Sequence, residues 1–220
     1  QRFAKWLQDL WPEAEAAGIS RKTFDRELKT VKLDWSLPHL VLPNPAAPGG
    51  PALPQSLVPK PMHQAEFDIP EHYFGKSALT SLAATGRAKM KQYAPELTAI
   101  QKRYQVPASI IVSIWGRETG FGQADLPHDA LTAIATQAFM GRRPDEFRPE
   151  LIGALKIIEL GHAKRAEMKS SWAGAMGYTQ FLPGDFEEHA VDHDGDGRRD
   201  IWNSVPDALA SAGNSLHSQG

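Results

Sequence analysis

The chain of 220 residues carries 24 lysines and arginines against 26 aspartates and glutamates, giving a formal net charge of -2 at pH 7. Its length favours one large domain or one and a half. The balanced charge argues against a nucleic-acid partner, because binding to a phosphate backbone usually leaves a basic composition. The absence of cysteine excludes disulfides, thiolate metal sites and cysteine nucleophiles. No apolar run approaches the ~20 residues that a membrane-spanning helix needs.

Residues 1–36 predict an N-terminal helical hairpin. The first helix has one apolar face, with the spacing i, i+3, i+4, i+7 and i+8, formed by Phe3, Trp6, Leu7, Leu10 and Trp11. Gly18 marks the end of this helix, and Ser20 is placed to cap a second helix. The second helix turns Phe24 and Leu28 inward.

Residues 37–75 predict a proline-rich connector. From Pro38 to Pro61, eight of 24 residues are proline. Neither a helix nor a central strand tolerates this density. Two interpretations are open: a flexible linker, or a polyproline segment that straps the hairpin to the rest of the chain.

Residues 76–220 predict an all-α domain. Alanine is abundant and β-branched residues are sparse, which favours helix over sheet, and no strand pattern is convincing. Pro95 interrupts the first helical pattern after the connector. The run 107–119 begins with proline and ends at Gly120, as a helix is expected to do. Asp129 is placed to cap the next helix.

The most informative residue is Glu118. On the predicted helix it follows Ile111 by seven residues and Ile114 by four, so helical geometry places it on their apolar stripe. Desolvation there raises the pKa of a carboxyl, which suits a general acid near neutral pH. Nearby glycines would leave room for a bulky substrate; they are Gly116, Gly120 and Gly122. The alternative is an ordinary glutamate at a helix end, which reaches water or pairs with Arg117.

Residues 171–183 combine small residues with flat apolar side chains. Small residues let the backbone approach a ligand, while Trp172, Tyr178 and Phe181 offer aromatic faces and Gln180 offers a donor and an acceptor. This mixture suits a carbohydrate, whose rings present C–H faces to aromatic rings and hydroxyls to amides. The alternative is a tight loop whose aromatic side chains return to the core.

The acidic segment 192–207 predicts a structural calcium site. Aspartates occupy positions 1, 3 and 5 of an EF-hand-like loop with glycine at position 6; they are Asp192, Asp194 and Asp196. At position 12 an EF-hand has a glutamate that binds calcium through both carboxylate oxygens, but this chain has Asn203 there. We expect Asp207 to close the shell instead, with the backbone carbonyl of Arg198 at position 7. The alternative is a solvated aspartate turn.

Two further features are less specific. Arg142 and Arg143 precede a predicted helix start, and they suit either a substrate carboxylate or an ordinary exposed pair. Ser171 lies in no G-x-S-x-G motif, which argues against a serine hydrolase.

Three motifs follow one another in the chain: SIWGRETGFG, SSWAGAMGYTQFLP and AVDHDGDGRRDIWNSVPDALAS. In combination they resemble the membrane-bound lytic murein transglycosylase B family, over most of the chain from about Phe24 to its end. The resemblance implies a lysozyme-like helical fold. It also implies cleavage of the β-1,4 bond between N-acetylmuramic acid and N-acetylglucosamine in peptidoglycan without water, which leaves a 1,6-anhydromuramoyl product.

The resemblance also implies roles for single residues. Glu118 matches the family's one catalytic acid and base. The glycan-binding set comprises Arg142, Arg143, Ser171, Met176, Gln180 and Phe181, to which we add Tyr178 for its aromatic face. The ligands of a structural Ca²⁺ are Asp192, Asp194, Asp196, Arg198 and Asp207. We expect no organic cofactor.

Two other functions stay open: a lysozyme-type muramidase that hydrolyses the same bond, and a non-catalytic glycan-binding scaffold. A hydrolase needs a second carboxylate, and the nearest candidates in sequence are Asp125 and Asp129.

The expected partners are peptidoglycan strands, with cell-wall synthesis or remodelling proteins as further candidates, and the expected oligomeric state is a monomer. The location of the substrate implies that the protein is periplasmic. A lipid anchor to the outer membrane, carried by a segment absent from this chain, stays an open alternative.

Overall fold

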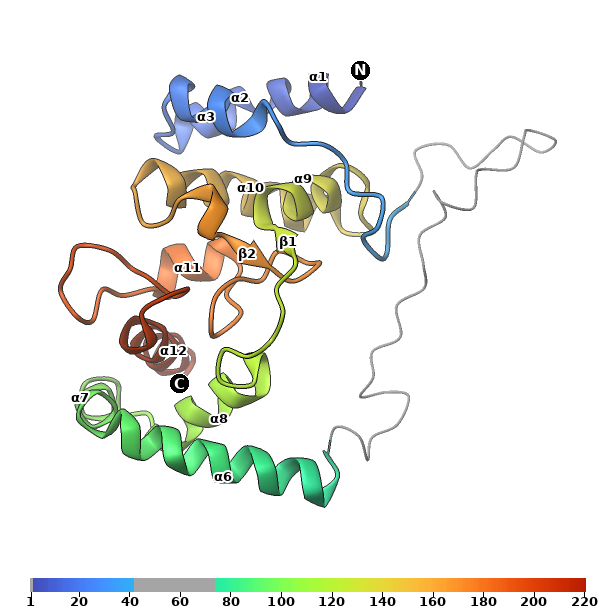
Figure 1. The fold of residues 1–220 in the computed structure, drawn as a ribbon. Coiled ribbons are helices and arrows are strands. Elements are labelled where there is room, and N and C mark those ends of the chain that lie inside the picture. The colour runs from blue at the N-terminus through green and yellow to red at the C-terminus, as the bar shows by residue number, and fades with distance from the viewer. Residues whose placement is uncertain (1, 42–73) are drawn as a thin grey trace. The chain divides into compact units, whose positions relative to one another are not determined.

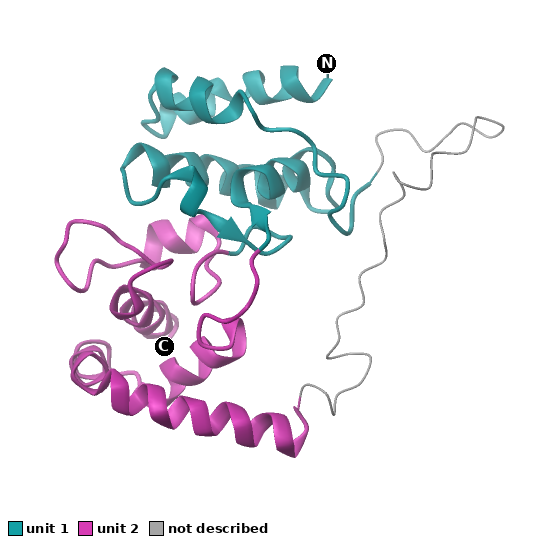
Figure 2. Cartoon of the chain, in the orientation of Figure 1, with its two compact units in different colours: residues 1–62, 127–175 teal, residues 63–126, 176–220 magenta. Residues whose placement is uncertain are grey.

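The computed structural model of the chain describes residues 2–41 and 74–220, which are mostly helical (Figure 1). The chain divides into two compact units (Figure 2): unit 1 takes residues 1–62 and 127–175, and unit 2 takes residues 63–126 and 176–220. The all-α prediction is confirmed apart from one small sheet. No helix in the described ranges is long and apolar enough to cross a membrane.

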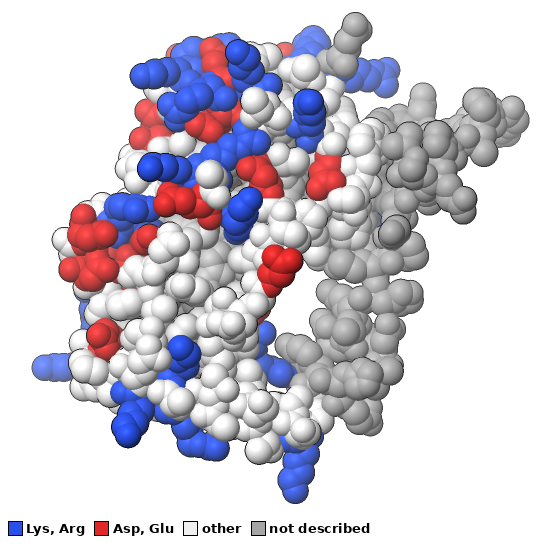
Figure 3. Space-filling model, in the orientation of Figure 1, with Lys and Arg blue, Asp and Glu red and all other residues white. Residues whose placement is uncertain are grey.

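Unit 1 is built around α9 and α10, which pack side by side (Figure 1). Its elements are α1 (Arg2–Asp9), α2 (Trp11–Ala16), α3 (Arg21–Leu28), β1 (His128–Asp129), α9 (Ala130–Met140), α10 (Pro144–Glu159), the short 3₁₀ helix η2 (Arg165–Glu167) and β2 (Lys169–Ser170). Helix α10 also packs against α2 and α3. Helix α9 is buried on almost every side, as its alanine-rich sequence allows. On the face drawn in Figure 3, basic and acidic side chains are interspersed over unit 1.

The caps predicted for unit 1 are confirmed. The Ser20 hydroxyl accepts a hydrogen bond from the amide of Thr23 at 3.2 Å and begins α3. The Asp129 carboxylate accepts one from the amide of Thr132 at 2.8 Å and begins α9. The first predicted helix, in contrast, is divided into α1 and α2 at Leu10.

The prediction that the chain holds no strand is wrong at one place. Strands β1 and β2 pair antiparallel, with His128 opposite Ser170 and Asp129 opposite Lys169. Each strand has two residues, which is too short for an alternating pattern of apolar and polar residues to appear in the sequence.

Unit 2 packs its helices around one apolar core. Its elements are α6 (Lys76–Gln92), α7 (Ala94–Tyr104), α8 (Ala108–Thr119), α11 (Pro183–His189) and α12 (Val205–Gln219). Helix α12 contacts α7, α8 and α11, and α6 contacts α7 and α8. The predicted break near Pro95 is confirmed, because α6 ends and α7 begins on either side of Tyr93. The largest side chains of the core are Leu97, Ile100, Tyr104, Ile111, Trp115, Phe121 and Leu209.

Residues 33–41, called the N-terminal strap below, pack along α9 in unit 1. Leu37 and Leu40 are buried in a cluster with side chains of α9. Leu40 forms an antiparallel bridge with Gly141, and the side-chain amide of Gln137 donates a hydrogen bond to the carbonyl of Pro38 at 3.1 Å. The rest of the predicted connector up to residue 73 lies outside the described residues, so the division into hairpin, connector and catalytic domain stays a prediction.

Candidate active site and calcium loop

Glu118 lies in the last turn of α8 in unit 2. The helix begins after Pro107 and ends at Gly120, whose φ of +56° closes it in the left-handed conformation. Both boundaries confirm the prediction. The buried residues of α8 are Ile111, Val112, Trp115, Gly116 and Thr119.

The position of Glu118 around this helix differs from the prediction. At 100° per residue it lies about 90° from the centre of the buried face, and its side chain is exposed. The buried face is centred on Trp115 and Thr119, so Ile114 and Glu118 flank it instead of forming its middle. Glu118 therefore lies beside the buried face and not on it, whereas the predicted partial desolvation of its carboxyl agrees with the raised pKa.

The carboxyl of Glu118 nevertheless has the electrostatics of a proton donor. Burial raises its pKa above the ordinary value for glutamate, because neighbouring protein atoms replace part of the water around the carboxyl although the side chain is exposed. No residue of the described ranges forms a hydrogen bond or an ion pair with it. Arg117, the alternative partner, places its guanidinium carbon 5.3 Å from the centre of the Phe74 ring.

The residues after Ala175 form a tight turn from Met176 to Phe181, called the 176–181 turn below. Met176 and Phe181 form an antiparallel bridge through two backbone hydrogen bonds of 2.8 and 3.0 Å. Gln180 adopts a left-handed φ of +57°, and its side-chain amide donates to the carbonyl of Gly177 at 3.1 Å. The turn thus presents Tyr178 and Gln180, which are half-buried.

Thr119 joins α8 to the 176–181 turn. Its hydroxyl donates to the backbone carbonyl of Tyr178 at 2.8 Å and accepts from the amide of Gly122 at 3.1 Å. The Tyr178 ring lies edge-on to Trp115, with 6.0 Å between the ring centres. Because Thr119 follows Glu118 directly, these contacts fix the catalytic candidate relative to Tyr178. No local pattern marks this role of Thr119, because the contact spans 59 residues.

Two of the glycines near Glu118 serve the protein's own packing. A Cβ at Gly116 would lie 2.6 Å from the Phe121 ring, and a Cβ at Gly122 would lie 2.6 Å from the Tyr178 ring. Gly177 is likewise covered, by the Ile201 carbonyl. The expectation that glycines leave space for substrate is therefore wrong for Gly116 and Gly122, because aromatic rings occupy it. At Gly120 a Cβ would meet only the Gln123 side chain, at 3.9 Å, so the expectation for Gly120 stays a prediction.

Three of the predicted binding residues lie in unit 1. The Ser171 hydroxyl accepts hydrogen bonds from the amides of Ala173 and Ala175 at 3.3 and 3.2 Å. Arg143 pairs with Glu146 at 3.0 Å. Arg142 is exposed and has no hydrogen bond or ion pair with the described residues, so the two arginines differ in their availability for a ligand.

Two other predicted binding residues have little exposed surface in unit 2. The side chain of Met176 is buried, and Phe181 is 8% exposed. Their part in glycan binding stays a prediction, and their burial favours a role in shaping the turn.

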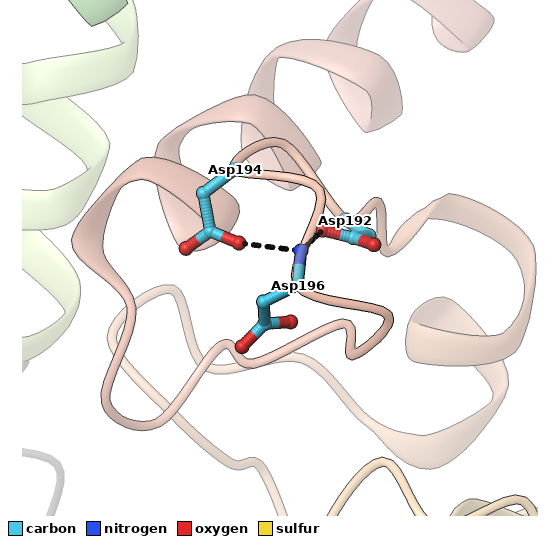
Figure 4. A group of neighbouring side chains, drawn as sticks. All are labelled: Asp192, Asp194 and Asp196. Atoms are coloured by element: carbon cyan, nitrogen blue, oxygen red, sulfur yellow. Dashed lines mark hydrogen bonds between the residues drawn. The ribbon is translucent and has the colours of Figure 1, made fainter.

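The aspartate loop gathers carboxylates in unit 2. One oxygen from each of Asp192, Asp194 and Asp196 lies within 4.8 Å of the others (Figure 4). Two ligands on opposite sides of a calcium ion, each at about 2.3–2.6 Å, span the same distance. The amide of Asp196 donates to both neighbouring carboxylates at 3.2 Å (Figure 4). The donor set and its spacing therefore fit a hard cation.

Asp207 organises the same loop from α12. One carboxylate oxygen accepts from the amide of His193 at 2.8 Å, and the other accepts from the amide of Asp200 at 2.8 Å. Burial raises the pKa of Asp207, and the nearby Asp194 carboxylate raises it further. The hydrogen bonds from these amides lower the pKa but do not outweigh burial. The Arg198 guanidinium lies 3.6 Å from Asp200. The roles of Asp207 and of the Arg198 carbonyl as metal ligands stay predictions.

The two candidates for a second carboxylate have different surroundings. Asp129 lies in unit 1, caps α9 and binds Arg165 through two hydrogen bonds of 2.9 and 3.1 Å. Burial alone would raise the pKa of Asp129, but the bonds from Arg165 and Thr132 hold it below its ordinary value. Asp125 is exposed in the segment after α8. Asp129 is therefore committed to a structural ion pair.

Unit 2 also holds a cavity of about 520 Å³ between α6 and α8. It is lined mainly by apolar side chains, with Arg87 and Arg117 among the polar ones. On α8 its lining includes Ser109, Val112 and Ser113, which lie on a different side of the helix from Glu118.

Comparisons with known proteins identify the family of the chain. Residues 2–220 match the family model described as the Transglycosylase SLT domain. Over 130 residues the chain is 38% identical to membrane-bound lytic murein transglycosylase B of Escherichia coli (strain K12), a match that covers 59% of this chain and 36% of that protein.

Solved structures show the same relationship. SltB3 from Pseudomonas aeruginosa in complex with NAG-NAM-pentapeptide has a TM-score of 0.78 at 34% identity, covering 99% of this chain and 53% of that one. The Escherichia coli lytic transglycosylase Slt35 in complex with calcium has a TM-score of 0.60 at 34% identity, covering 64% of this chain and 45% of that one. This chain thus spans only about a third to a half of the length of these relatives. Because the family model matches almost every residue, the chain belongs to the transglycosylase SLT domain family.

Proposed function

We propose that the chain is a lytic transglycosylase that cleaves the β-1,4 bond between N-acetylmuramic acid and N-acetylglucosamine in peptidoglycan without water. The observation that carries the proposal is the carboxyl of Glu118, which has a raised pKa and no fixed partner among the described residues. Such a group holds a proton at a pH where an ordinary glutamate has lost it, and it is free to give that proton to a substrate.

In the proposed reaction Glu118 acts twice. Protonated Glu118 donates its proton to the glycosidic oxygen while the bond from C1 of the muramic residue to that oxygen breaks through an oxocarbenium-like state. The resulting carboxylate then removes the proton from the C6 hydroxyl, whose oxygen forms a bond with C1. The products are a new N-acetylglucosamine hydroxyl and a 1,6-anhydromuramoyl end. Glu118 is protonated again, and no water is consumed.

One carboxyl suffices because the acetamido group of the muramic residue is expected to assist at C1. A retaining hydrolase would instead place a second carboxylate about 5–5.5 Å from the first, and an inverting one about 6.5–9.5 Å away. Asp129 is held by Arg165 and caps a helix, which argues against a nucleophilic role. Asp125 is exposed but lies outside the three motifs that carry the family resemblance, and we therefore propose the lytic reaction over a lysozyme-type muramidase.

In unit 2 we assign sugar binding to the 176–181 turn, which the hydrogen bond from Thr119 ties to the end of α8. The half-buried ring of Tyr178 suits the C–H face of a sugar, and Gln180 suits its hydroxyl and amide groups. We assign substrate contacts in unit 1 to Arg142 and Ser171, with Arg143 held by Glu146. Relatives support a glycopeptide ligand, because SltB3 is described in complex with NAG-NAM-pentapeptide.

We also propose a structural Ca²⁺ in the aspartate loop, held by Asp192, Asp194, Asp196, the Arg198 carbonyl and Asp207. The spacing of the first three carboxylates supports it, and so does the description of Slt35 in complex with calcium. The ion would neutralise carboxylates that otherwise repel one another, and it would hold the loop before α12.

The proposed substrate places the protein in the periplasm, as a monomer that meets peptidoglycan strands and cell-wall synthesis or remodelling proteins.

The proposed function is tested by digesting purified sacculi with the parent chain and with Glu118→Gln. We expect the parent to release soluble muropeptides and Glu118→Gln to bind sacculi without releasing them. If the parent binds sacculi and releases nothing, the chain is a non-catalytic glycan-binding scaffold and the proposal is wrong.

A further inference from the structure

We propose that Asp200 is a positioning residue, which couples the conformation of the aspartate loop to that of the 176–181 turn. The proposal rests on the proposed function, because it assigns a control to the same site, and it uses the calcium ion proposed for the loop. All of its contacts lie within unit 2. They run from the loop through Asp207, Asp200 and the peptide group of residues 201–202 to Tyr178.

Asp207 joins the aspartate loop to Asp200. Its side chain is fully buried, and its two carboxylate oxygens accept from different segments. One accepts from the amide of His193 in the loop, and the other accepts from the amide of Asp200, each at 2.8 Å. Leaving a buried carboxylate oxygen without a partner costs free energy. The position of Asp200 therefore depends on the conformation of the loop.

The side chain of Asp200 orients the peptide group between Ile201 and Trp202. Its Oδ1 accepts from the amide of Trp202 at 3.0 Å and from the amide of Asn203 at 2.8 Å. The Trp202 N–H and the Ile201 carbonyl belong to the same planar peptide group. Because Asp200 fixes the direction of the N–H, it also fixes the direction of the carbonyl.

The Ile201 carbonyl bonds the 176–181 turn. It accepts from the amide of Tyr178 at 2.9 Å. The two segments also pack together at Gly177, where a Cβ would lie 2.6 Å from the same carbonyl oxygen. Ile201 is fully buried, so water cannot replace the Tyr178 amide at its carbonyl. A rotation of this peptide group would therefore leave a buried acceptor unpaired.

Tyr178 connects these contacts to the proposed site. Its amide is held by Ile201, and its carbonyl accepts from the Thr119 hydroxyl at 2.8 Å. Tyr178 and Gln180 are the sugar-binding groups assigned to this turn, and Thr119 follows Glu118 directly. The conformation of the peptide group before Trp202 therefore affects how the turn presents its binding groups.

The state of the aspartate loop depends on a cation. Its three carboxylates lie within 4.8 Å of one another (Figure 4), and like charges at this distance repel one another. A bound calcium ion would replace this repulsion with attraction and hold the loop in one conformation. Hydrogen-bond networks carry coupling between sites, so calcium should also order the 176–181 turn through Asp207 and Asp200.

The test measures hydrogen exchange at single backbone amides of the full chain by NMR, with calcium and with a chelator. Three amides are compared: His193 in the loop, Tyr178 in the turn, and Ile100 as the reference. Ile100 is fully buried within α7, so its exchange reports the stability of unit 2. A change in overall stability alters exchange at Ile100 and Tyr178 alike. The difference between these two amides therefore measures the coupling.

Three variants separate the coupling from a general loss of stability. Asp200→Ala removes the acceptor of the Trp202 amide, whereas Asp200→Asn keeps the shape and an oxygen that can accept it. Asn214→Ala is the matched control. It removes a side-chain hydrogen bond to the carbonyl of His189 at 2.9 Å, which lies in unit 2 but outside the proposed contacts. Melting curves establish that each variant folds, and the response of the parent tests the coupling even if Asp200→Ala does not.

In the parent we expect calcium to slow exchange at His193 and at Tyr178 about tenfold relative to Ile100, the effect of one hydrogen bond to a charged group. In Asp200→Ala the His193 amide should still respond, because the loop and Asp207 are intact, but the Tyr178 amide should not. Asp200→Asn should restore the response at Tyr178, and Asn214→Ala should keep it.

A response at His193 alone in the parent would overturn the coupling. A response at Tyr178 that persists in Asp200→Ala would overturn the assignment to Asp200. If none of the amides responds to calcium, the ion and the coupling are both wrong.

Calorimetry with an oligomer of N-acetylglucosamine then tests whether the coupling affects sugar binding, with Glu118→Gln as the background to prevent turnover. We expect Asp200→Ala to weaken binding about tenfold and Asn214→Ala to leave it unchanged. Equal losses in both variants would overturn the positioning role. The exchange measurement needs no glycan, so the two proposals fail separately. If the parent releases nothing from sacculi while its Tyr178 amide responds to calcium, the proposed function is wrong and the coupling stands.

Discussion

The hydroxyl of Thr119 donates a hydrogen bond to the backbone carbonyl of Tyr178, with 2.8 Å between the two oxygens. This contact ties the end of α8 to the 176–181 turn within unit 2; Thr119 is buried and Tyr178 is half-buried. The residue before it is Glu118 and the turn carries Gln180, so a single side chain fixes the proposed acid relative to the proposed sugar-binding turn.

The first prediction concerns this contact. Thr119→Val keeps the shape of the side chain but removes the donor, which leaves the carbonyl of Tyr178 and the amide of Gly122 without their partner. We expect the free energy of unfolding in urea to fall by about 1–3 kcal/mol, the cost of buried polar groups left unpaired. We also expect a lower kcat on sacculi, because the end of α8 is no longer fixed against the turn.

Thr98→Val is the matched control. Thr98 donates a similar hydrogen bond to Ala94 within α7, but it is exposed, so its loss should change the unfolding free energy by less than about 0.5 kcal/mol. Equal effects of the two substitutions would show that the Thr119 contact has no special part in the site.

The second prediction concerns the proton of Glu118. Glu118→Gln should lower the cleavage rate at least about 100-fold, the usual contribution of a general acid. In the parent, the rate should fall as the pH rises through the pKa of Glu118. This fall should lie above the ordinary glutamate value of about 4.3, because burial raises that pKa.

The raised pKa of Glu118 also determines whether Glu118→Gln raises or lowers the stability of the protein. A carboxyl whose pKa is raised on folding stabilises the protein below its unfolded pKa, and this contribution is lost as the pH rises through the folded pKa. At pH 7 Glu118→Gln should therefore melt at or above the parent's temperature. A clear loss of stability there would show that Glu118 has a structural partner.

Asp125→Asn, which changes an exposed carboxylate nearby in the sequence, is the control for the cleavage rate. It should leave the cleavage rate unchanged; a large loss of rate would favour a two-carboxylate hydrolase.

The third prediction concerns Arg165. Its guanidinium binds Asp129 through two hydrogen bonds and also donates to the carbonyl of Glu27 at 2.6 Å, so it joins α3 to the start of α9. Arg165→Met should lower the unfolding free energy by about 1.5–3 kcal/mol at pH 7. Lys5→Met breaks the exposed pair with Asp9 and should cost less than about 1 kcal/mol.

The Arg165 effect should depend on pH. The pKa of Asp129 is lower in the folded protein than its ordinary value of about 3.9. Its contribution is therefore complete above that value and is lost as the pH falls through the folded pKa. The difference in stability between parent and Arg165→Met should narrow below about pH 4. A difference that stays constant down to pH 2 would show that the ion pair does not stabilise the fold.

The fourth prediction concerns the aspartate loop. Calcium at about 100 times its dissociation constant should stabilise the parent by about 2.7 kcal/mol, and a chelator should reverse the rise in melting temperature. Asp196→Asn should abolish this response. Without calcium the variant should be at least as stable as the parent, because one of three neighbouring carboxylates loses its charge. If the melting temperature of the parent does not respond to calcium, the loop holds no structural ion.

The parts of the fold that the sequence predicts are those with local signals. Ser20 and Asp129 were identifiable as caps because their side chains bond the amide three residues later. The ends of α8 follow from a proline and a glycine that are local to the helix. The aspartate loop follows from spacing alone.

The contacts that sequence reasoning missed are formed between distant segments. Thr119 meets Tyr178 across 59 residues, and Arg165 meets Glu27 across 138; no pattern within either segment marks such a pair. The direction of the buried face of α8 was predicted wrongly for the same reason, because it depends on the core around Trp115 and Phe121. Aromatic rings of that core and beside it also fill the space that Gly116 and Gly122 leave.

The most direct test of the proposed chemistry is digestion of peptidoglycan in water enriched in ¹⁸O, followed by mass spectrometry of the new muramic ends. If Glu118 closes the C6 oxygen onto C1, the ends are anhydro, one water lighter than reducing ends, and contain no ¹⁸O. Reducing ends labelled with ¹⁸O would contradict the account, because they show that water attacked C1 and that the protein is a hydrolase.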